Sequence, residues 1–434
     1  MTKGFEISVK PERAFLIGVC SKKQSKEDYD YKMTELLQLS ETAEIIVVKT
    51  FVQALDKPDV STLVGKGKLE EIISLIETDQ ISTLIFNDNL SSSQARNIAQ
   101  KTKCNVVDRT ELILDIFAKH AKTHESILQV ELAQLEYSYS KLRHLWQHFS
   151  RIAGGAVGVR GPGETQIEID RRLVRERISM LKNKLLDIKK TTEIKRKKRS
   201  NQISICLVGY TNAGKSTLFN ALTKEKIYTA DKLFATLDST TRALKMDSKV
   251  NVLLTDTIGF IENLPTTLIQ SFYSTLYEVR EADLLFHVVD VNNPKKDFYI
   301  QTVNKILNEL NACDKDILLV FNKSDTQSQL QKKEINSLYP DSVFVSAKTG
   351  ENIDILKEYI NQYIFKRKVF KKYLIPANME NLISFLHNHT EIQSINYLPE
   401  QHHYECETMI DANIVKNIEE QLDKSRLINF IDSG

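Results

Sequence analysis

The residues from Gly209 to Ser216 have the types and spacing of a phosphate-binding loop. They follow the pattern G-x4-G-K-S, directly after the apolar run ISICLV and directly before a helix-forming segment at 217–222. Glycines allow backbone N–H groups to face phosphate oxygens, and the N-terminus of the following helix adds a positive end. We therefore expect Lys215 to reach the β- and γ-phosphates and the Ser216 hydroxyl to bind Mg²⁺.

Two later motifs would complete a nucleotide site. Asp256-Thr-Ile-Gly259 follows the run NVLLTD, which places a carboxylate near the metal and a glycine N–H near the γ-phosphate. In Asn322-Lys-Ser-Asp325, the Asp325 carboxylate can accept hydrogen bonds from the ring N–H and the exocyclic amine of guanine. Adenine cannot offer that pair, so the base selected is guanine.

The remaining contacts follow from these motifs. Lys323 is expected along the base plane, and segment 346–348 closes the site with the Ala347 N–H on the guanine carbonyl oxygen. Together the motifs predict binding of GTP and GDP and hydrolysis of GTP. The expected nucleotide contacts are Gly209, Tyr210, Thr211, Asn212, Ala213, Gly214, Lys215, Ser216, Thr217, Asp256, Thr257, Ile258, Gly259, Asn322, Lys323, Ser324, Asp325, Ser346, Ala347 and Lys348.

The elements that position these residues can be inferred from the apolar runs. ISICLV, NVLLTD, DLLFHVVD, DILLVFNK and SVFVSA alternate with helix-length segments. Such alternation is typical of a doubly wound, mostly parallel sheet with its ligand site at the carboxyl ends of the strands. The first 108 residues show a similar α/β alternation, with strands expected at 15–19, 45–48, 83–86 and 106–107.

Between these two regions the apolar residues recur in steps of three and four. One stripe runs from Leu128 to Phe149 and a second from Val174 to Ile188, on either side of the glycine-rich segment 151–165. Two such stripes around one loop predict an antiparallel helical hairpin that buries both seams. For either stripe alone, the alternative is a core-facing helix of a globular domain.

A basic run, KKTTEIKRKKR at 189–199, follows the hairpin. Six arginines nearby extend the positive surface: Arg151, Arg160, Arg171, Arg172, Arg175 and Arg177. Because binding to nucleic acid requires such a density of cations, an RNA contact competes here with the simpler interpretation of a solvated linker.

Composition restricts the class of protein. The 41% apolar fraction supports packed cores, and a net charge of +2 argues against a globally basic nucleic-acid wrapper. No apolar run is long enough for a membrane span or a secretory signal, so we expect a cytoplasmic protein without stable membrane insertion. The five cysteines lie far apart, which favours free or buried thiols over a zinc site. We expect a monomer.

Several segments resemble the HflX family of GTPases, and the resemblance covers nearly the whole chain. Besides the nucleotide motifs, they are LVGKGKLEEI at Leu63, LQVELAQLEY at Leu128, GPGETQIEIDRR at Gly161 and FATLDSTTR at Phe234. The resemblance makes the last segment switch I, with Thr236 as a second Mg²⁺ ligand beside Ser216. It implies further nucleotide contacts at Phe234, Ala235, Thr236, Leu237 and Asp238, and roles in hydrolysis for Lys215, Thr236 and Gly259.

The resemblance also implies a partner, the large ribosomal subunit and its rRNA, and a function, the splitting of stalled or idle ribosomes under stress. Phe260 follows the switch II glycine, and a phenyl ring cannot orient an attacking water as the glutamine of many GTPases does. We therefore expect slow intrinsic hydrolysis that ribosome binding accelerates. Asn212 lies where some related GTPases coordinate K⁺, although loop hydrogen bonding is the role we favour for it.

Two other classes of function remain as alternatives. An ATP-dependent RNA-remodelling enzyme would use the N-terminal domain, where Gly65-Lys66-Gly67-Lys68 is the only local hint and a surface turn is the simpler explanation. A signalling GTPase would act on a protein partner, which the paired basic helices argue against.

Four domains are expected. They are an α/β N-terminal domain at 1–123, a helical hairpin with a glycine-rich loop and basic linker at 124–199, a P-loop GTPase domain at 200–366, and a small α+β domain at 367–434. The last should contain a strand at 369–375, a helix at 379–389, strands near Ile395 and at 404–410, and a helix at 412–422. Without cysteines or carboxylates at ligand spacing, its four histidines are expected at the surface: His387, His389, His402 and His403.

Overall fold

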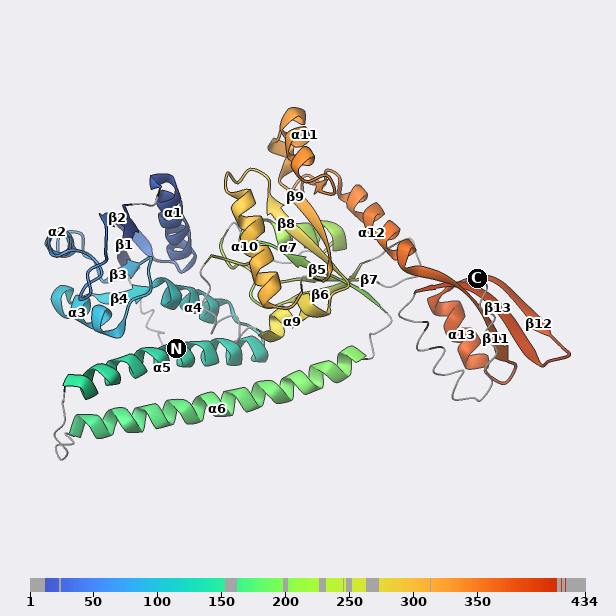
Figure 1. Ribbon diagram of the computed structural model, residues 1–434, viewed down its shortest axis with the longest axis horizontal. Helices are drawn as coiled ribbons and strands as arrows, with labels where there is room; N and C mark the ends of the chain where they lie inside the picture. Colours follow the sequence, from blue (N-terminus) through green and yellow to red (C-terminus); the bar gives the residue numbers. More distant parts are fainter. Residues whose placement is uncertain are drawn as a thin grey trace, which may run out of the picture. The chain divides into compact units, whose positions relative to one another are not determined.

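The computed structural model describes residues 12–22, 25–152, 162–197, 202–225, 232–244, 246, 252–262, 273–312, 314–411, 415 and 418 (Figure 1). Most of the glycine-rich loop, including Arg160, and Cys313 lie outside these residues. The chain divides into two compact units. Unit 1 comprises residues 1–188, 230–238 and 261–274, and unit 2 comprises residues 189–229, 239–260 and 275–434.

Unit 1 is built on a four-stranded parallel sheet with the order β2-β1-β3-β4. The strands are β1 (Arg13–Ser21), β2 (Ile46–Leu55), β3 (Thr83–Phe86) and β4 (Asn105–Asp108). They alternate with helices α1 (Lys26–Thr42), α2 (Lys66–Ile76), α3 (Ser92–Thr102) and α4 (Arg109–His120). Residues 14–17 of β1 are all fully buried, as expected for a central strand covered on both faces. The expected α/β class is confirmed.

Local sequence explains where several helices begin. Ser91 caps α3 and Asp108 caps α4, and in each case the side-chain oxygen of the third residue of the helix, a glutamine or a glutamate, accepts a hydrogen bond from the backbone N–H of the cap. These reciprocal capping boxes satisfy N–H groups that a helix start otherwise leaves without partners. Because Asp108 also ends β4, one residue terminates a strand and begins a helix.

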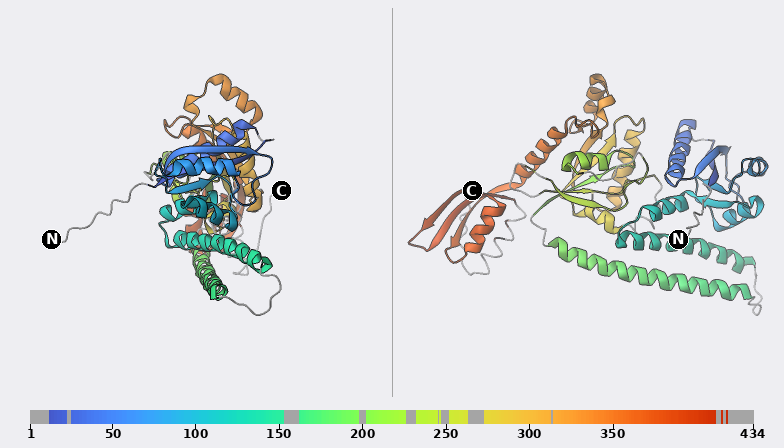
Figure 2. Two further views of the ribbon diagram at one scale, coloured as in Figure 1. Left: turned by 90° about the vertical axis from the view of Figure 1, so that its left-hand side faces the viewer. Right: turned by 180° about the vertical axis from the view of Figure 1, so that it is seen from behind.

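The predicted helical hairpin is formed by α5 (His124–Ile152) and α6 (Pro162–Lys197), which run side by side in Figures 1 and 2. Leu128 and Leu132 of α5 pack with Leu181 of α6, which is fully buried. Two details differ from expectation. The helix α6 already begins at Pro162, and it continues to Lys197, so the basic run is helical and not a linker. Lysine, arginine and glutamate are good helix formers, and no glycine or proline interrupts them there.

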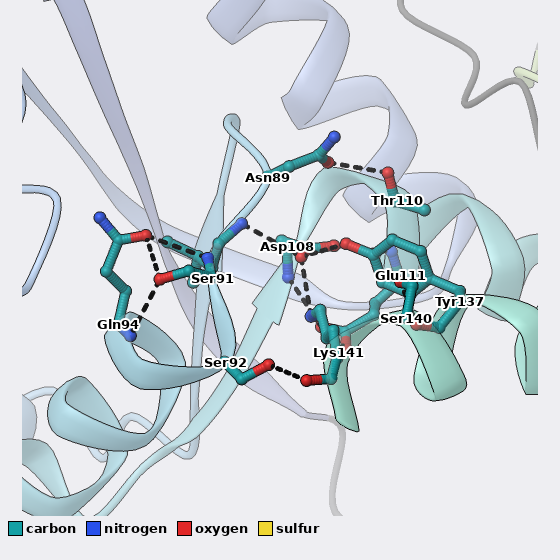
Figure 3. Close-up of polar contacts among 11 residues, drawn as sticks. Asn89, Ser91, Ser92, Gln94, Asp108, Thr110, Glu111, Tyr137, Ser140 and Lys141 are labelled. Carbon is teal, nitrogen blue, oxygen red and sulfur yellow. Dashed lines mark hydrogen bonds and ion pairs between the residues drawn. The ribbon is translucent and has the colours of Figure 1, made fainter. Parts of the chain in front are cut away.

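A buried carboxylate joins α5 to the sheet of unit 1 (Figure 3). Asp108 is fully buried and accepts hydrogen bonds from the Tyr137 hydroxyl at 2.6 Å and from the Glu111 N–H at 3.0 Å. It also pairs with Lys141 at 2.8 Å, and Lys141 pairs with Glu111 at 2.7 Å. The Lys141 carbonyl in turn accepts from the Ser92 hydroxyl at 2.6 Å. The first helix of the hairpin is therefore attached to both α3 and α4.

Unit 2 contains a six-stranded sheet with the order β10-β9-β8-β5-β7-β6. Its parallel strands are β5 (Ile203–Val208), β7 (Val252–Asp256), β8 (Leu284–Asp290), β9 (Asp316–Asn322) and β10 (Val343–Phe344). The edge strand β6 (Thr240–Leu244) is antiparallel to β7 and was not expected, because TTRAL lacks an apolar run. The helices are α7 (Lys215–Thr223), α9 (Tyr273–Glu281), α10 (Lys296–Glu309), α11 (Gln329–Leu338) and α12 (Ile353–Arg367). The doubly wound sheet is confirmed.

The end of unit 2 forms a separate antiparallel sheet with the order β11-β13-β12. Its strands are β11 (Lys368–Pro376), β12 (Glu391–Leu398) and β13 (His403–Asp411), and α13 (Glu380–His389) packs on it. Of the helix expected at 412–422 the structure describes only Val415 and Ile418, both helical and both packed on this core. Among the described residues, no helix is long and apolar enough to cross a membrane.

Replacing Asp108 with alanine is expected to destabilise unit 1 by about 3 kcal/mol, because the Tyr137 hydroxyl loses its acceptor and Lys141 loses one of two partners. Hydrogen exchange at the amides of β3 and β4 would measure the free energy of opening of the unit 1 sheet. This measurement does not require both units to unfold together. Asp56→Ala is the matched control, because that carboxylate is 74% exposed. Equal exchange in Asp108→Ala and in the unmodified chain would contradict the assignment.

Candidate nucleotide-binding site

The phosphate loop of unit 2 requires two of its glycines. Gly209 has φ +151°, and a Cβ atom there would lie 2.2 Å from the carbonyl oxygen of Val288 on the neighbouring strand β8. Gly214 has φ +88°, and a Cβ atom there would lie 2.2 Å from Nδ2 of Asn322. Both conformations are ones that other residues rarely adopt. The loop between β5 and α7 can therefore take this close path only with glycine at both positions.

Lys215 is held inside the loop that it follows. Its side chain is 6% exposed, and Nζ donates to the carbonyl oxygens of Gly209 at 3.1 Å and Tyr210 at 2.9 Å. Burial lowers the pKa of this ammonium group to about 8, although the neighbouring Asp256 carboxylate favours the charged form. A cation is thus fixed where the sequence predicts the β- and γ-phosphates.

Ser216 and Asp256 lie together beside Lys215. The Ser216 hydroxyl donates to Oδ2 of Asp256 at 2.6 Å, and Asp256 is fully buried at the end of β7. Thr257 fixes the chain after this carboxylate, because its hydroxyl donates to the Leu207 carbonyl at 2.7 Å. A hydroxyl and a carboxylate oxygen at this separation form the hard oxygen donor set that Mg²⁺ prefers. These residues therefore fit the expected metal ion.

The switch II segment begins in backbone contact with the phosphate loop. The Phe260 N–H donates to the Gly209 carbonyl at 3.0 Å, and the Thr211 N–H donates to the Phe260 carbonyl at 2.8 Å. A Cβ atom on Gly259 would lie 2.8 Å from Cα of Thr211, so no side chain fits between the two segments. The Phe260 side chain is only 1% exposed. Its ring is packed away from solvent and has no polar atom with which to orient water.

The base-binding segments are joined to the phosphate loop by one side chain. Asn322 is 2% exposed, its Nδ2 donates to the Ala213 carbonyl at 3.0 Å, and its Oδ1 accepts from the Ala347 N–H at 3.0 Å. Lys323 adopts φ +62°, and its Nζ donates to the Asn212 carbonyl at 3.2 Å. The Ala347 N–H, predicted to meet the guanine carbonyl, is therefore already engaged by Asn322.

Asp325 is available as an acceptor. The residue is exposed, in contrast to its neighbour in sequence, Ser324, and to Ser346, which are both fully buried. A hydrogen bond from the Ser346 side chain lowers the pKa of the Asp325 carboxyl below its usual value. The carboxylate is therefore ionised at neutral pH, which is the form that accepts hydrogen bonds from a guanine.

Three residues near the site were not anticipated. Asp290 ends β8 and pairs with Lys323 at 2.8 Å, and Tyr299 stacks on Tyr210 with ring centroids 3.6 Å apart. His287 lies on β8 and is 2% exposed, and burial together with Lys215 lowers its pKa to about 3. A carboxylate at the end of DLLFHVVD was a usable signal for Asp290. Nothing in the sequence pattern distinguished His287 or Tyr299 from ordinary core residues.

The predicted switch I residues, Phe234 to Asp238, belong to unit 1, whereas the phosphate loop and its partners belong to unit 2. Unit 2 therefore brings together the phosphate loop, residues 256–259, residues 322–325 and residues 346–348. The predicted metal ligand Thr236 is half-buried within unit 1, close in sequence to the buried Phe234 and Leu237.

Part of the predicted basic surface is used within the hairpin. The Arg175 guanidinium lies 5.4 Å from the centre of the Tyr139 ring, and Nε donates to the hydroxyl of that tyrosine. Arg177 pairs with Glu131 at 2.6 Å, which ties α6 to α5. In contrast, the side chain of Arg172 is 72% exposed and has its ion pair at 3.8 Å on its own helix. Basic residues therefore both join the helices and face solvent.

The glycine–lysine run of the N-terminal domain is not a phosphate loop in this structure. Gly65 precedes α2 with φ −64°, and its N–H donates to Oε1 of Gln53 at 2.8 Å. Lys66, Gly67 and Lys68 already belong to the helix. The expected surface turn is thus the first turn of α2.

Comparison with known proteins gives matches along the chain. Three family models match: "GTP-binding GTPase N-terminal" at residues 30–118, "GTP-binding GTPase Middle Region" at 120–199, and "50S ribosome-binding GTPase" at 204–323. Among solved structures, a GTP-binding protein from Sulfolobus solfataricus in complex with GDP is 26% identical, with a TM-score of 0.45, over 81% of this chain and 98% of that chain.

Two curated relatives establish the family. The GTPase HflX of Flavobacterium psychrophilum is 46% identical over 319 residues, which are 74% of this chain and 77% of the relative. The GTPase HflX of Alkalihalophilus pseudofirmus is 40% identical over 415 residues, which are 95% of this chain and 97% of the relative. By this extent of identity, the chain belongs to the HflX family of GTPases.

Proposed function

We propose that this GTPase requires Mg²⁺, binds the rRNA of the large ribosomal subunit in the cytoplasm, and splits stalled or idle ribosomes under stress. The observation that carries the proposal is the presence, in one chain, of a guanine-nucleotide site and a long basic helical hairpin. The match to a family described as a 50S ribosome-binding GTPase supports the choice of partner. A hairpin with exposed arginine side chains suits a polyanion such as rRNA.

The residues of the proposed nucleotide site have separate tasks in the reaction. Backbone N–H groups of the phosphate loop and Lys215 hold the phosphates, and Ser216 and Asp256 hold Mg²⁺. When bound, the ion neutralises charge on the β- and γ-phosphate oxygens. Thr236 is proposed as a further metal ligand, and the Gly259 N–H as a donor to the γ-phosphate. Asp325 then selects guanine.

The predicted donor to the guanine carbonyl, the Ala347 N–H, is already hydrogen-bonded to Asn322. Because the Ala347 N–H donates to Asn322, the carbonyl must share that hydrogen or accept from the next N–H, that of Lys348. If the Ala347 N–H is shared between Asn322 and the guanine carbonyl, Asn322 still keeps its hydrogen bond to the phosphate loop. Ala347 and Lys348 are therefore both kept as proposed base contacts.

Hydrolysis by the isolated chain should be slow. The Phe260 ring is buried and cannot orient water, while its backbone holds switch II against the phosphate loop. We propose that the ribosome supplies or orders the missing group, so that GTP hydrolysis follows docking and governs release.

Asp325→Asn is expected to weaken GTP binding about 100-fold or more, because the amide presents one acceptor and one donor to two donors of guanine. Xanthosine triphosphate, which has a carbonyl in place of the exocyclic amine, should be bound better by the variant than by the unmodified chain. Titration with fluorescent nucleotides would measure both affinities. Asp341→Asn, another exposed aspartate of unit 2, is the control; if it shifts the preference equally, Asp325 is not the base-reading group.

The ribosome proposal predicts that intact ribosomes dissociate when incubated with the protein and GTP, as measured by subunit sedimentation in a gradient. GTP turnover should also rise on addition of large subunits. Gly214→Ala is the matched inactive variant, because its added Cβ would collide with Asn322 in the phosphate loop. If ribosomes stay intact with GTP, with a non-hydrolysable analogue and with GDP, the splitting proposal is rejected. If large subunits leave GTP turnover unchanged, the proposed activation by the ribosome is rejected.

Hydrolysis rates in potassium and sodium chloride are expected to be equal. Asn212 adopts φ +61°, and its carbonyl accepts from Lys323, which supports a role in loop hydrogen bonding. Steady-state phosphate release at matched ionic strength would measure the two rates. A rate several-fold higher in potassium would instead assign K⁺ to this loop.

A further inference from the structure

Switch I is anchored in unit 1 by apolar side chains. Leu233, Phe234 and Leu237 are 4%, 2% and 2% exposed. The Phe234 ring meets the ring of Phe117 on α4 edge to face, with centroids 4.7 Å apart and an interplanar angle of 86°. Phe234 has φ +56°, a left-handed conformation that is unfavourable for such a residue and persists only where its surroundings fix it. These contacts define the path of the chain on one side of Thr236.

On the other side of Thr236, the carboxylate of Asp238 is fixed. Oδ1 accepts from the Thr123 hydroxyl at 2.7 Å, and Oδ2 accepts from the N–H groups of Lys122 at 3.1 Å and Thr123 at 3.3 Å. These donors lie immediately before α5, and the Thr123 hydroxyl also accepts from the Ser126 N–H at 3.1 Å, as an N-cap residue does. A carboxylate at a helix start is further favoured by the positive end of the helix.

The direct nucleotide contact that the family resemblance implied for Asp238 stays a prediction, because in this structure its carboxylate is engaged at the start of α5. Both of its oxygens accept hydrogen bonds from the start of α5, and a carboxylate would repel phosphate. Two residues away, Thr236 lies between Phe234 and Asp238, each of which is tied to unit 1. The chain is therefore anchored to unit 1 two residues before and two residues after Thr236.

Switch II has a comparable attachment. Ile261 is fully buried in unit 1, and Glu262 pairs with Lys32 of α1 at 3.1 Å, with both side chains about one quarter exposed. Phe260, the residue before this pair, is hydrogen-bonded to the phosphate loop in unit 2. Switch II therefore runs from a residue hydrogen-bonded to the phosphate loop into a contact with α1.

We propose that Asp238 is a positioning residue for GTP binding and hydrolysis: through Lys122 and Thr123 it holds switch I in order, so that Thr236 is pre-arranged for the metal and γ-phosphate. By the reciprocity of linked equilibria, GTP then stabilises the contact at the start of α5, and the hairpin senses the nucleotide. The inference rests on the proposed function, in which Thr236 contacts the γ-phosphate side of GTP.

The test compares GTP with GDP, because Thr236 can act only on the nucleotide that has a γ-phosphate. Asp238→Ala in the full chain should bind a non-hydrolysable GTP analogue about tenfold more weakly, with GDP affinity unchanged, as expected for the loss of hydrogen bonds to a charged group. Thr123→Val removes the hydroxyl and keeps the N–H, so it should cause a smaller loss. The double variant should match Asp238→Ala, because both changes break one interaction.

A second readout observes the contact directly. Amide hydrogen exchange at Lys122 and Thr123 should be slower with the GTP analogue than with GDP in the unmodified chain, and equal with both in Asp238→Ala. Asp30→Ala, an exposed aspartate of α1, should leave both affinities and the exchange difference unchanged.

The possible outcomes separate this inference from the proposal on which it rests. Equal weakening of both nucleotides would show a role in folding only, unchanged analogue affinity would show no role, and tighter analogue binding would show that the anchor competes with GTP; each overturns the inference. Failure of the unmodified chain to bind guanine nucleotides would instead reject the proposed function.

Discussion

In unit 2 the side chain of Asn322 holds two other loops at once, and the nucleotide site depends on this amide. Its NH₂ group reaches the phosphate loop at Ala213, and its carbonyl oxygen reaches the segment that faces the base at Ala347. The same side chain excludes any Cβ atom at Gly214. Because the group is buried, loss of either partner would leave a polar atom unsatisfied, which costs more than the hydrogen bond itself contributes. One side chain therefore joins the phosphate loop to the segment proposed to bind the base.

The two units are interleaved in sequence at the segments predicted to be switches I and II. Phe260 is assigned to unit 2 and Ile261 to unit 1, so one peptide bond separates a residue hydrogen-bonded to the phosphate loop from one buried in the other unit. Switch I leaves unit 2 and returns to it within nine residues, 230–238. The segments that the family resemblance makes switches I and II are thus assigned in part to the unit that contains the N-terminal sheet.

Much of this architecture was predictable because it depends on local rules. Strand, glycine loop and helix at 203–223 follow one another in sequence, and the stripes of α5 and α6 need only helical periodicity. The partner of Asp238 was not predictable, because Thr123 lies 115 residues earlier. The backbone N–H groups that also donate to this carboxylate carry no signal in the sequence, since nearly every residue has one. The hydrogen bond from the Ala347 N–H to Asn322 was not predictable for the same reason, because Asn322 lies 25 residues earlier. Helix propensity could have shown that the basic run extends α6, but its charge suggested a linker.

The length of α6 has a mechanical consequence. Its 36 residues make a rod of about 54 Å, and after Gly163 it contains no glycine or proline at which it could bend sharply. A rotation of about 5° at one end of such a rod displaces the other end by about 5 Å, since the displacement grows with length. A small change of tilt at one end of α6 would therefore produce a displacement of several ångströms at its other end.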